Sequence, residues 1–558
     1  MSLAAWEGRQ ATWVWLAGGL GRRVSKEVPT MKRLTNVVVL VALLGAVAAA
    51  AAPPPIEKVE IVDRAFCVNG RPFLPIMAWL QDANKFPLVV ECGMNATAGY
   101  WSTSSGTKDV TEYLPLVAKA GLYGVMPFDV RLKGHPALLG YIHDDEPDLP
   151  HEESDAEVVP AAGLKINPKT PLWKMLDGVT HSWSVLDPLQ GAAVTIRLKQ
   201  PVTVTALAVH LTISPGLAVA KEVVFEGDGK EILKATLDAK TGPQKFDLPG
   251  PATFRALAMT VRSTYPGDNE WGSVGEIEGF DASGKNVLAA PPRDVPRATP
   301  GETLEKYKAM KAGDASRPGF MTFTGYFHPH FSKYTDAERE ALYGAYIRAA
   351  DVVGYDIYPI YGWNKPEWIY LVYDATRQLT AMAGTRPVYA WIETSKGGQY
   401  TGSLEDQKAV TPQHIRAEVW MAVTGGATAI GYFTHVWKPA YHQFGVPEEN
   451  RKALRAVNDQ LTRLAPAILG KVPARPAAVG AGDVKLAALT REHDGRLYVF
   501  AVNYDERLKE AGAVFEIAGL KAGAAVEVVD EDRTLRAADG RFTDTFAPLA
   551  VHIYRIAP

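Results

Sequence analysis

Apolar and polar positions follow two different periods along this chain. From Phe66 to Pro147, short apolar runs typical of buried strands alternate with segments of helical period, and the same alternation resumes from Thr303 to Phe433. A helix after each strand returns the chain to the start of the next one, so this pattern predicts a parallel sheet. The predicted strands are Phe73 to Trp79, Asn95 to Gly99, Tyr123 to Phe128, Leu138 to His143, Gly319 to Thr324, Val352 to Tyr358, Pro387 to Ile392 and Thr428 to Phe433.

Four predicted strands precede the interruption and four follow it. Eight parallel strands with helical crossovers make an α/β fold of the (β/α)8 barrel type, also called a TIM barrel. Between the halves the period changes to two, with frequent Gly, Pro and Asp turns, which predicts an inserted β-sandwich. The expected domains are residues 53–154 and 293–469 for the barrel, 155–292 for the insert and 470–558 for a C-terminal β-sandwich.

The N-terminal region has the pattern of an export signal. Residues 31–52 combine the basic Met31-Lys32-Arg33, an apolar run and a series of alanines, which predicts a cleaved signal peptide and a secreted or periplasmic protein. Residues 1–30 add a second basic segment and are interpreted as an upstream start. A membrane anchor is the alternative, but about 16 apolar residues are short for a span of about 20.

Composition excludes several classes of function. The 59 Lys and Arg against 62 Asp and Glu give a net charge of −3, which offers no concentrated basic field for nucleic acid. Two cysteines, Cys67 and Cys92, cannot make a four-cysteine zinc site, and whether they pair is left open. We expect no cofactor and no metal, and the sequence does not indicate the oligomeric state.

Two glutamates follow predicted strands of the barrel. Glu146 comes after the fourth strand and Glu393 after the seventh. Catalytic groups of such barrels lie at the C-terminal ends of the strands, and strands four and seven face each other across the mouth. Retaining glycoside hydrolysis needs two carboxyl groups about 5 to 5.5 Å apart, one as acid and one as nucleophile, whereas about 6.5 to 9.5 Å indicates inversion.

With these glutamates, Phe66 to Glu153 and Arg297 to Leu464 resemble the clan A glycoside hydrolases. The resemblance implies that Glu146 is the acid/base and Glu393 the nucleophile, and that the substrate is an oligo- or polysaccharide with a β-glycosidic bond. It also implies that Tyr358 contacts the nucleophile and that Trp437 floors the sugar subsite. Asp145 stands where the commonest motif has Asn, which adds a negative charge beside Glu146.

Further polar and aromatic side chains are expected at the same rim. Aromatic faces pack against the C–H faces of sugars while polar groups orient the hydroxyls. Asp356, two residues before Tyr358, is interpreted as a structural or supporting residue. The predicted substrate-binding residues are Asp145, Trp101, Tyr326, Tyr358, Trp363, Trp391, His435 and Trp437.

Two other functions are kept as alternatives. His328 and His330, with His143 and His435 at nearby rim positions, make a metal-dependent barrel hydrolase conceivable. A barrel that binds glycans without cleaving them is the other alternative, although intact Glu146 and Glu393 disfavour it.

The insert carries a resemblance of its own. Leu176-Asp177-Gly178, Ser182-Trp183 and Trp271-Gly272-Ser273-Val274-Gly275-Glu276-Ile277 are similar to discoidin-type (factor 5/8 C-type) modules, a fold of many carbohydrate-binding modules. Trp183 is expected in the core of this module. Tyr265 and Trp271 are the candidates for glycan contact.

Overall fold

The computed structural model describes residues 53–101 and 106–557, so the expected signal peptide and the upstream segment lie outside the described residues. The chain divides into two compact units. One holds the residues up to Leu149 together with those from Pro296 onward, and the other is Pro150–Val295. None of the helices formed by these residues has the length and apolar character needed to cross a bilayer.

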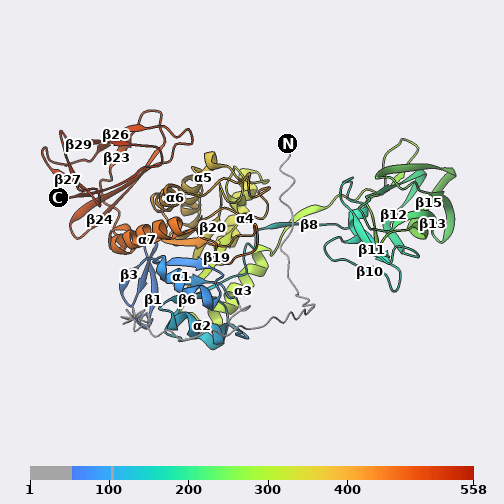
Figure 1. The fold of residues 1–558 in the computed structure, drawn as a ribbon, viewed down its shortest axis with the longest axis horizontal. Coiled ribbons are helices and arrows are strands. Elements are labelled where there is room, and N and C mark those ends of the chain that lie inside the picture. Colours follow the sequence, from blue (N-terminus) through green and yellow to red (C-terminus); the bar gives the residue numbers. More distant parts are fainter. Residues whose placement is uncertain (1–52, 102–105, 558) are drawn as a thin grey trace, which may run out of the picture. The chain divides into compact units, whose positions relative to one another are not determined.

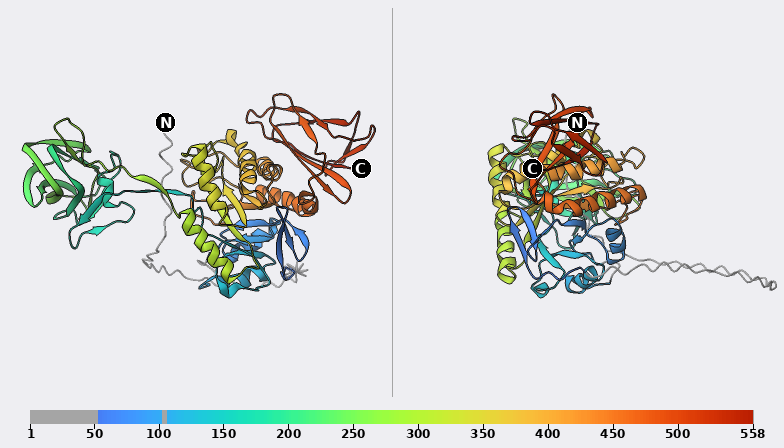
Figure 2. Two further views of the ribbon diagram at one scale, coloured as in Figure 1. Left: turned by 180° about the vertical axis from the view of Figure 1, so that it is seen from behind. Right: turned by 90° about the vertical axis from the view of Figure 1, so that its left-hand side faces the viewer.

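A closed barrel of eight parallel strands forms the centre of the first unit and confirms the predicted fold class. Its strand order is β19-β20-β21-β22-β4-β5-β6-β7, so strands from both sides of the insert pair with one another. Figures 1 and 2 show the blue and the yellow-orange segments closing one barrel. The strands are β4 (Ile76–Trp79), β5 (Ala96–Ala98), β6 (Tyr123–Pro127), β7 (Leu138–Ile142), β19 (Gly319–Phe323), β20 (Val352–Asp356), β21 (Val388–Glu393) and β22 (Ala429–Phe433).

Helices surround these strands, and local sequence signals set where they begin. At the start of α3, the Thr299 side chain accepts from the Glu302 amide and the Glu302 side chain accepts from the Thr299 amide. Thr335 and Glu338 form the same capping box on α4, which satisfies amides that the helix itself cannot pair. The helices are α1 (Phe86–Glu91), α2 (Val110–Lys119), α3 (Pro300–Gly313), α4 (Asp336–Ile347), α5 (Leu371–Ala383), α6 (Pro412–Gly425) and α7 (Glu448–Ile468).

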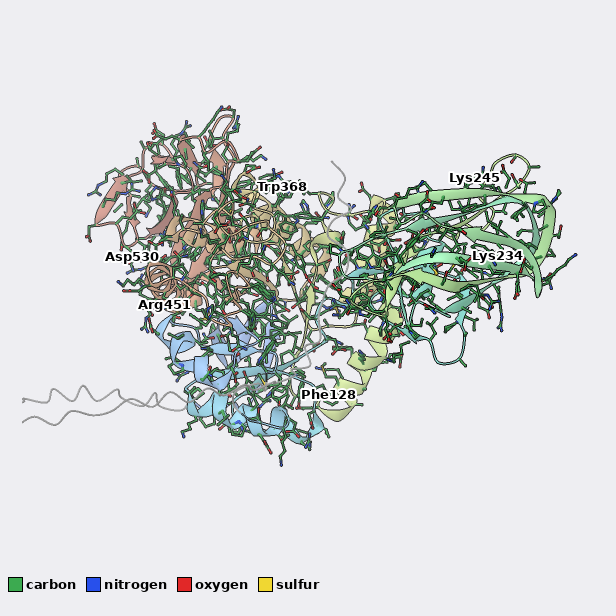
Figure 3. The ribbon with its side chains drawn as sticks, turned by 45° about the vertical axis from the view of Figure 1, so that its right-hand side comes forward. Phe128, Lys234, Lys245, Trp368, Arg451 and Asp530 are labelled. Carbon is green, nitrogen blue, oxygen red and sulfur yellow. The ribbon has the colours of Figure 1, made fainter. Side chains whose placement is uncertain are left out.

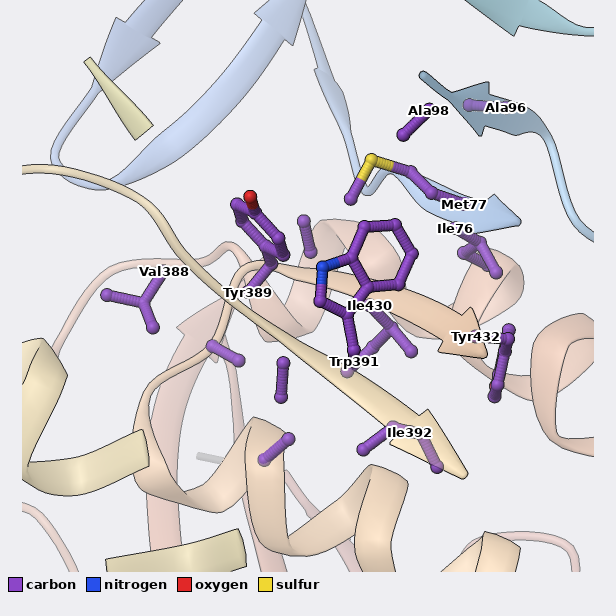
Figure 4. Close-up of a cluster of buried hydrophobic side chains, with 14 of the residues drawn as sticks. Ile76, Met77, Ala96, Ala98, Val388, Tyr389, Trp391, Ile392, Ile430 and Tyr432 are labelled. Atoms are coloured by element: carbon purple, nitrogen blue, oxygen red, sulfur yellow. The ribbon is translucent and has the colours of Figure 1, made fainter. Parts of the chain in front are cut away.

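Aromatic rings fill the barrel interior. Tyr389 and Trp391 project from β21 toward Met77 of β4 (Figure 4), and Thr322 Oγ1 bonds both the Tyr389 hydroxyl at 2.8 Å and Trp391 Nε1 at 3.2 Å. Glycines on the neighbouring strands make room for the rings. A Cβ added at Gly354 would lie 2.2 Å from the Tyr389 ring. The interior is therefore a packed core that closes the barrel beneath its rim.

A small antiparallel sheet precedes the barrel. Its strands are β1 (Val59–Val62), β2 (Ala65–Val68) and β3 (Arg71–Phe73). Phe66 of this sheet stacks on Phe320 of β19, with the ring centroids 5.7 Å apart.

The insert is an antiparallel domain built on two long strands. The predicted strands Ala193 to Leu198 and Val202 to Leu211 form one strand, β12 (Ala193–Leu211), with an irregularity between Arg197 and Val202. It pairs with β15 (Gly242–Tyr265) in a six-stranded sheet, and Lys234 and Lys245 lie on this domain (Figure 3). The other strands are β8 (Pro150–Glu153), β9 (Glu157–Pro160), β10 (Lys165–Ile166), β11 (Ser184–Asp187), β13 (Val219–Gly227), β14 (Lys230–Thr236), β16 (Gly272–Val274), β17 (Ile277–Phe280) and β18 (Arg293–Pro296).

The C-terminal domain consists of a three-stranded and a five-stranded antiparallel sheet, and it packs on the barrel helices. Trp420 of α6 stacks on Phe500 with ring centroids 5.5 Å apart, and Gln460 of α7 donates to Asp530 at 2.7 Å. The strands are β23 (Ala478–Gly480), β24 (Leu486–His493), β25 (Arg496–Asn503), β26 (Ala511–Glu516), β27 (Ala525–Val528), β28 (Arg533–Arg536), β29 (Arg541–Phe546) and β30 (Val551–Ile556).

Two glycines test the packing of the barrel interior. Gly354→Ala should lower the free energy of unfolding by about 1 to 3 kcal/mol, because its methyl group would overlap the Tyr389 ring. Gly344 lies within α4 and has no atom within 4 Å of an added Cβ, so Gly344→Ala should raise stability by about 0.5 to 1 kcal/mol. Scanning calorimetry measures both, and equal effects of the two substitutions would contradict the packing described.

Candidate functional site

The C-terminal end of β7 carries the first candidate carboxyl group. The chain leaves β7 at Ile142 and reaches Glu146, whose φ of 49° lies in the left-handed region that non-glycine residues seldom occupy. The residue is 6% exposed. Such a conformation is strained for a long side chain and persists only where surrounding contacts hold it.

The carboxyl group of Glu146 lies beside that of Asp356, the last residue of β20, close enough for the two to share a proton. Burial raises the pKa of Glu146. Burial also raises the pKa of Asp356 well above its ordinary value, and repulsion from the charges of Glu146 and Asp145 adds to this rise. Burial followed by repulsion from Glu146 raises the pKa of Asp145 as well. The pair therefore retains a proton at a pH where free carboxyl groups have lost theirs.

Arg297 supplies positive charge at this cluster. Its Nη2 lies 3.6 Å from Glu146 Oε2, and its Nη1 donates to the backbone carbonyl of Asp145. The backbone continues the link, since the amide of Arg297 donates to Leu149 O at 2.9 Å and that of Ala298 to Pro147 O at 3.0 Å. Residues 297 and 298 thus place a positive charge beside Glu146 and hold the backbone of residues 147–149 by hydrogen bonds.

A fourth carboxyl group, Asp148, is fully engaged in hydrogen bonds. It accepts from the Thr324 amide at 3.0 Å, from the Thr324 hydroxyl at 2.6 Å and from the Tyr343 hydroxyl at 2.7 Å. These bonds tie the segment after Glu146 to the end of β19 and to α4, which is a structural role.

Glu393 has a different environment from the one expected. Its side chain is fully buried, and its oxygens accept from the amide of Ile360 at 2.9 and 3.1 Å and from that of Tyr361 at 2.6 Å. The carboxyl group that it meets is Glu418 of α6. Burial raises the pKa of Glu393 to about 7. The structure thus joins Glu146 to Asp356 and Glu393 to Glu418, and the assignment of Glu393 as nucleophile stays a prediction.

Aromatic side chains from several loops gather at the same end of the barrel. Trp437 lies parallel to Phe433 with the ring centroids 5.9 Å apart, and Trp101 packs against Tyr441 and His435. Tyr441 is 43% exposed. From the β20–α5 loop, Tyr358 packs on Phe433 and Trp363 stacks on Phe331 at 4.9 Å. Tyr326, in the turn after β19, is partly exposed.

Two residues expected to bind substrate are buried instead. Trp391 is 2% exposed because the two-residue period of β21 directs it into the barrel interior with Tyr389. His435 is also 2% exposed, and its ring nitrogens bond the Tyr441 hydroxyl at 2.9 Å and Trp79 O at 3.0 Å. Trp391 acts in packing, and His435 acts by holding Tyr441.

The histidines of the metal alternative are engaged separately. His143 Nε2 bonds Ala349 O at 2.9 Å, and His328 Nδ1 accepts from the His330 amide at 3.2 Å. Among residues 53–101 and 106–557, no group of three or more His, Cys, Asp or Glu side chains is arranged to hold a metal ion. Cys67 and Cys92 are free thiols, and burial raises the pKa of Cys92 to about 12.

The insert exposes two tryptophans. Trp183, expected in its core, is 41% exposed, and Trp271 is 36% exposed. Tyr265 ends β15 and donates from its hydroxyl to Leu237 O at 3.1 Å, so it is part of the sheet and not of a free loop.

No protein-family model matches this chain, and no curated protein matches its sequence. Solved structures give distant matches. A family 32 carbohydrate-binding module of Clostridium perfringens NanJ, solved with galactose, has 11% identity over 23% of this chain and 96% of that one, with a TM-score of 0.20. An Anoxybacillus α-amylase has 14% identity over 47% of this chain, with a TM-score of 0.34, and the match spans 57% of the amylase.

Sequence reasoning gave Asp356 only a structural or supporting role and did not single out Arg297. Asp356 is a carboxylate at the end of a barrel strand, and the rule that selected Glu146 and Glu393 also applies to it. Arg297 had no local signal, because 150 residues separate it from Glu146 in the sequence and only the fold brings the two together.

The Arg297 contact predicts a pH-dependent stability difference. Arg297 lowers the pKa of Glu146 and Asp145, so Arg297→Gln should raise both pKa values further. A carboxyl group whose folded pKa is raised loses stabilising free energy as the pH rises toward that pKa. The melting temperature of Arg297→Gln should therefore fall below that of the wild type by more at about pH 8 than at about pH 5.

Arg293→Gln is the matched control, because Arg293 pairs with the exposed Glu153. Its effect on the melting temperature should be small at either pH. A deficit of Arg297→Gln that does not change with pH would contradict the electrostatic role of Arg297.

Proposed function

We propose that this chain is an exported retaining glycoside hydrolase that cleaves a β-glycosidic bond in an oligo- or polysaccharide. The neighbouring pair of Glu146 and Asp356, at the C-terminal ends of two barrel strands and among partly exposed aromatic side chains, carries this proposal. Two neighbouring carboxyl groups that hold one proton supply both an acid and a nucleophile.

In the first step, Glu146 donates its proton to the glycosidic oxygen while a carboxylate oxygen of Asp356 attacks the anomeric carbon. The bond from that carbon to the leaving oxygen breaks, and a covalent glycosyl ester forms on Asp356. In the free protein the contact between the two groups raises the pKa of Asp356 and lowers that of Glu146, so the shared proton has to move to Glu146 when substrate binds. Retaining enzymes hold the two carboxyl groups about 5 to 5.5 Å apart, so Glu146 and Asp356, which lie side by side, have to separate when the sugar enters between them.

In the second step, ionised Glu146 removes a proton from water, and the water oxygen attacks the anomeric carbon. The ester bond breaks, Asp356 leaves as a carboxylate and Glu146 is protonated again. Two inversions at one carbon give net retention of configuration. Arg297 balances the negative charge that passes between these groups.

The geometry favours Asp356 over Glu393 as the nucleophile. Asp356 is partly exposed and meets Glu146 directly, whereas Glu393 has no exposed surface and its oxygens are occupied by two backbone amides. A nucleophile has to contact the anomeric carbon of the sugar, and the amides of Ile360 and Tyr361 cover the oxygens of Glu393 that would do so.

The accessory features fit carbohydrate as the substrate. Tyr358 lies next to the carboxyl pair, and Trp363, Trp437 and Tyr441 are partly or largely exposed aromatic side chains of the same rim, a kind that packs on sugar rings. We extend the proposal to the insert, whose exposed Trp183 and Trp271 would contact glycan, and to export through the signal peptide that begins at Met31.

Substitutions at the pair test the mechanism. In a screen on chromogenic glycosides and polysaccharides, Glu146→Gln and Asp356→Asn should each lose activity about 100- to 10,000-fold. Asp144→Asn is the control and should keep full activity, because Asp144 is exposed in the same loop and pairs with Lys306. Proton NMR of the first product should show retained configuration.

Azide decides which residue is the nucleophile. It should restore turnover, with inverted product, to Asp356→Gly and not to Glu393→Gly. Rescue of Glu393→Gly alone would return the nucleophile role to Glu393. Loss of activity on chelation, restored by zinc or manganese, would favour the metal hydrolase, and glycan binding without turnover in the wild type would favour the non-catalytic alternative.

A further inference from the structure

A second pair of buried carboxyl groups lies where β21 meets α6. Glu393 ends the strand, Glu418 lies in the middle of the helix, and both are 0% exposed. The Glu418 carboxyl group hydrogen-bonds to that of Glu393. The backbone amide of Glu393 also points to this carboxyl group, and beyond Glu393 neither Glu418 oxygen has a hydrogen-bond partner within the described residues.

The surroundings determine which member of this pair holds the proton. Two carboxylates in contact without water cannot both be ionised, because neither charge would be solvated. The amides of Ile360 and Tyr361 point at Glu393 and stabilise its negative charge. Glu418 therefore stays protonated, and its O–H donates a hydrogen bond to the Glu393 carboxylate. Burial and the charge of Glu393 raise the pKa of Glu418 well above its ordinary value.

The titratable side chains that face this pair are neutral. Tyr355 of β20 faces Glu418, and Tyr361 of the β20–α5 loop faces Glu393. Burial and the adjacent acid raise the pKa of each phenol above its ordinary value. The pair therefore receives its stabilisation from backbone amides and from its own shared proton.

The amides bound by Glu393 belong to the loop that continues from Asp356. Ile360 and Tyr361 follow Asp356 by four and five residues, and Tyr358 lies between them and Asp356. The loop closes on itself through the Gly362 amide, which donates to Tyr358 O at 2.8 Å. Fixing the two amides therefore restricts the path of the chain immediately after Asp356.

We propose that Glu393 and Glu418 form a buried carboxylate–carboxylic acid couple that positions the β20–α5 loop, and with it Asp356 and Tyr358. Glu393 is then a positioning residue that acts through the loop and does not touch substrate. This inference rests on the proposed function, because it gives Asp356 the place at the sugar.

Substitutions by glutamine separate the two members of the couple. Glu418→Gln keeps a donor for Glu393 and should preserve the loop, whereas Glu418→Met removes the donor. Glu393→Gln places an amide NH2 where both neighbouring groups are N–H donors, so one of the loop amides loses its acceptor. Glu418→Met thus loses the hydrogen bond between the two side chains, Glu393→Gln loses one hydrogen bond to the loop, and Glu418→Gln keeps both.

Hydrogen exchange of the whole chain, measured by mass spectrometry, reads the loop directly. Exchange in residues 357–370 should accelerate about tenfold or more in Glu393→Gln and in Glu418→Met, and stay near the wild-type rate in Glu418→Gln. Unchanged exchange in Glu393→Gln would overturn the proposal. If Glu393→Gln does not fold, the contrast between Glu418→Met and Glu418→Gln decides, and equal exchange in those two overturns it.

Kinetics distinguish this proposal from the proposed function. kcat/KM should fall about 10- to 100-fold in Glu393→Gln, with azide giving no recovery in Glu393→Gly, and should stay near the wild-type value in Glu418→Gln. Azide rescue of Glu393→Gly would overturn the positioning role. Full activity in Asp356→Asn with faster loop exchange in Glu393→Gln would refute the proposed nucleophile and leave the loop couple standing.

Discussion

Carboxyl groups with little access to water determine how the rim of this barrel is organised. Asp145, Glu146 and Asp356 converge there, and Arg297 lies beside them. Ionising several buried acids at once costs more free energy, through desolvation and mutual repulsion, than attraction to one guanidinium can offset. The cluster therefore has to retain protons. The same constraint that makes the rim costly to fold thus raises the pKa values of its acids above the ordinary range.

The barrel meets this cost with contacts from distant parts of the chain. Asp148 receives hydrogen bonds from β19 and α4, and Glu393 receives them from the amides of the β20–α5 loop. Beneath the rim, Tyr389 and Trp391 fill the barrel interior and are held by hydrogen bonds, so the carboxyl groups lie above a packed core. Positioning of this kind is what catalytic groups require, because small displacements weaken proton transfer and attack.

The sequence predicted the architecture well because its signals are local. Strands such as Leu138–Ile142 are short apolar runs bounded by turns, and helices such as Pro300–Gly313 begin at capping residues, so each element is specified within a few positions. Eight such strands leave the closed barrel as the natural solution. The period of two also explains Trp391, which belongs to the core by its place in β21.

The sequence by itself determined the barrel, the inserted and C-terminal β-domains, and the position of Glu146 and Glu393 at strand ends. Only the tertiary structure decided which carboxyl groups meet. Asp356 and Glu393 are the last residues of their strands and Glu146 follows its strand, so neighbouring loops and helices decide which groups these side chains meet. The left-handed backbone of Glu146 and the amides offered by the β20–α5 loop therefore set the partners, Asp356 for Glu146 and Glu418 for Glu393.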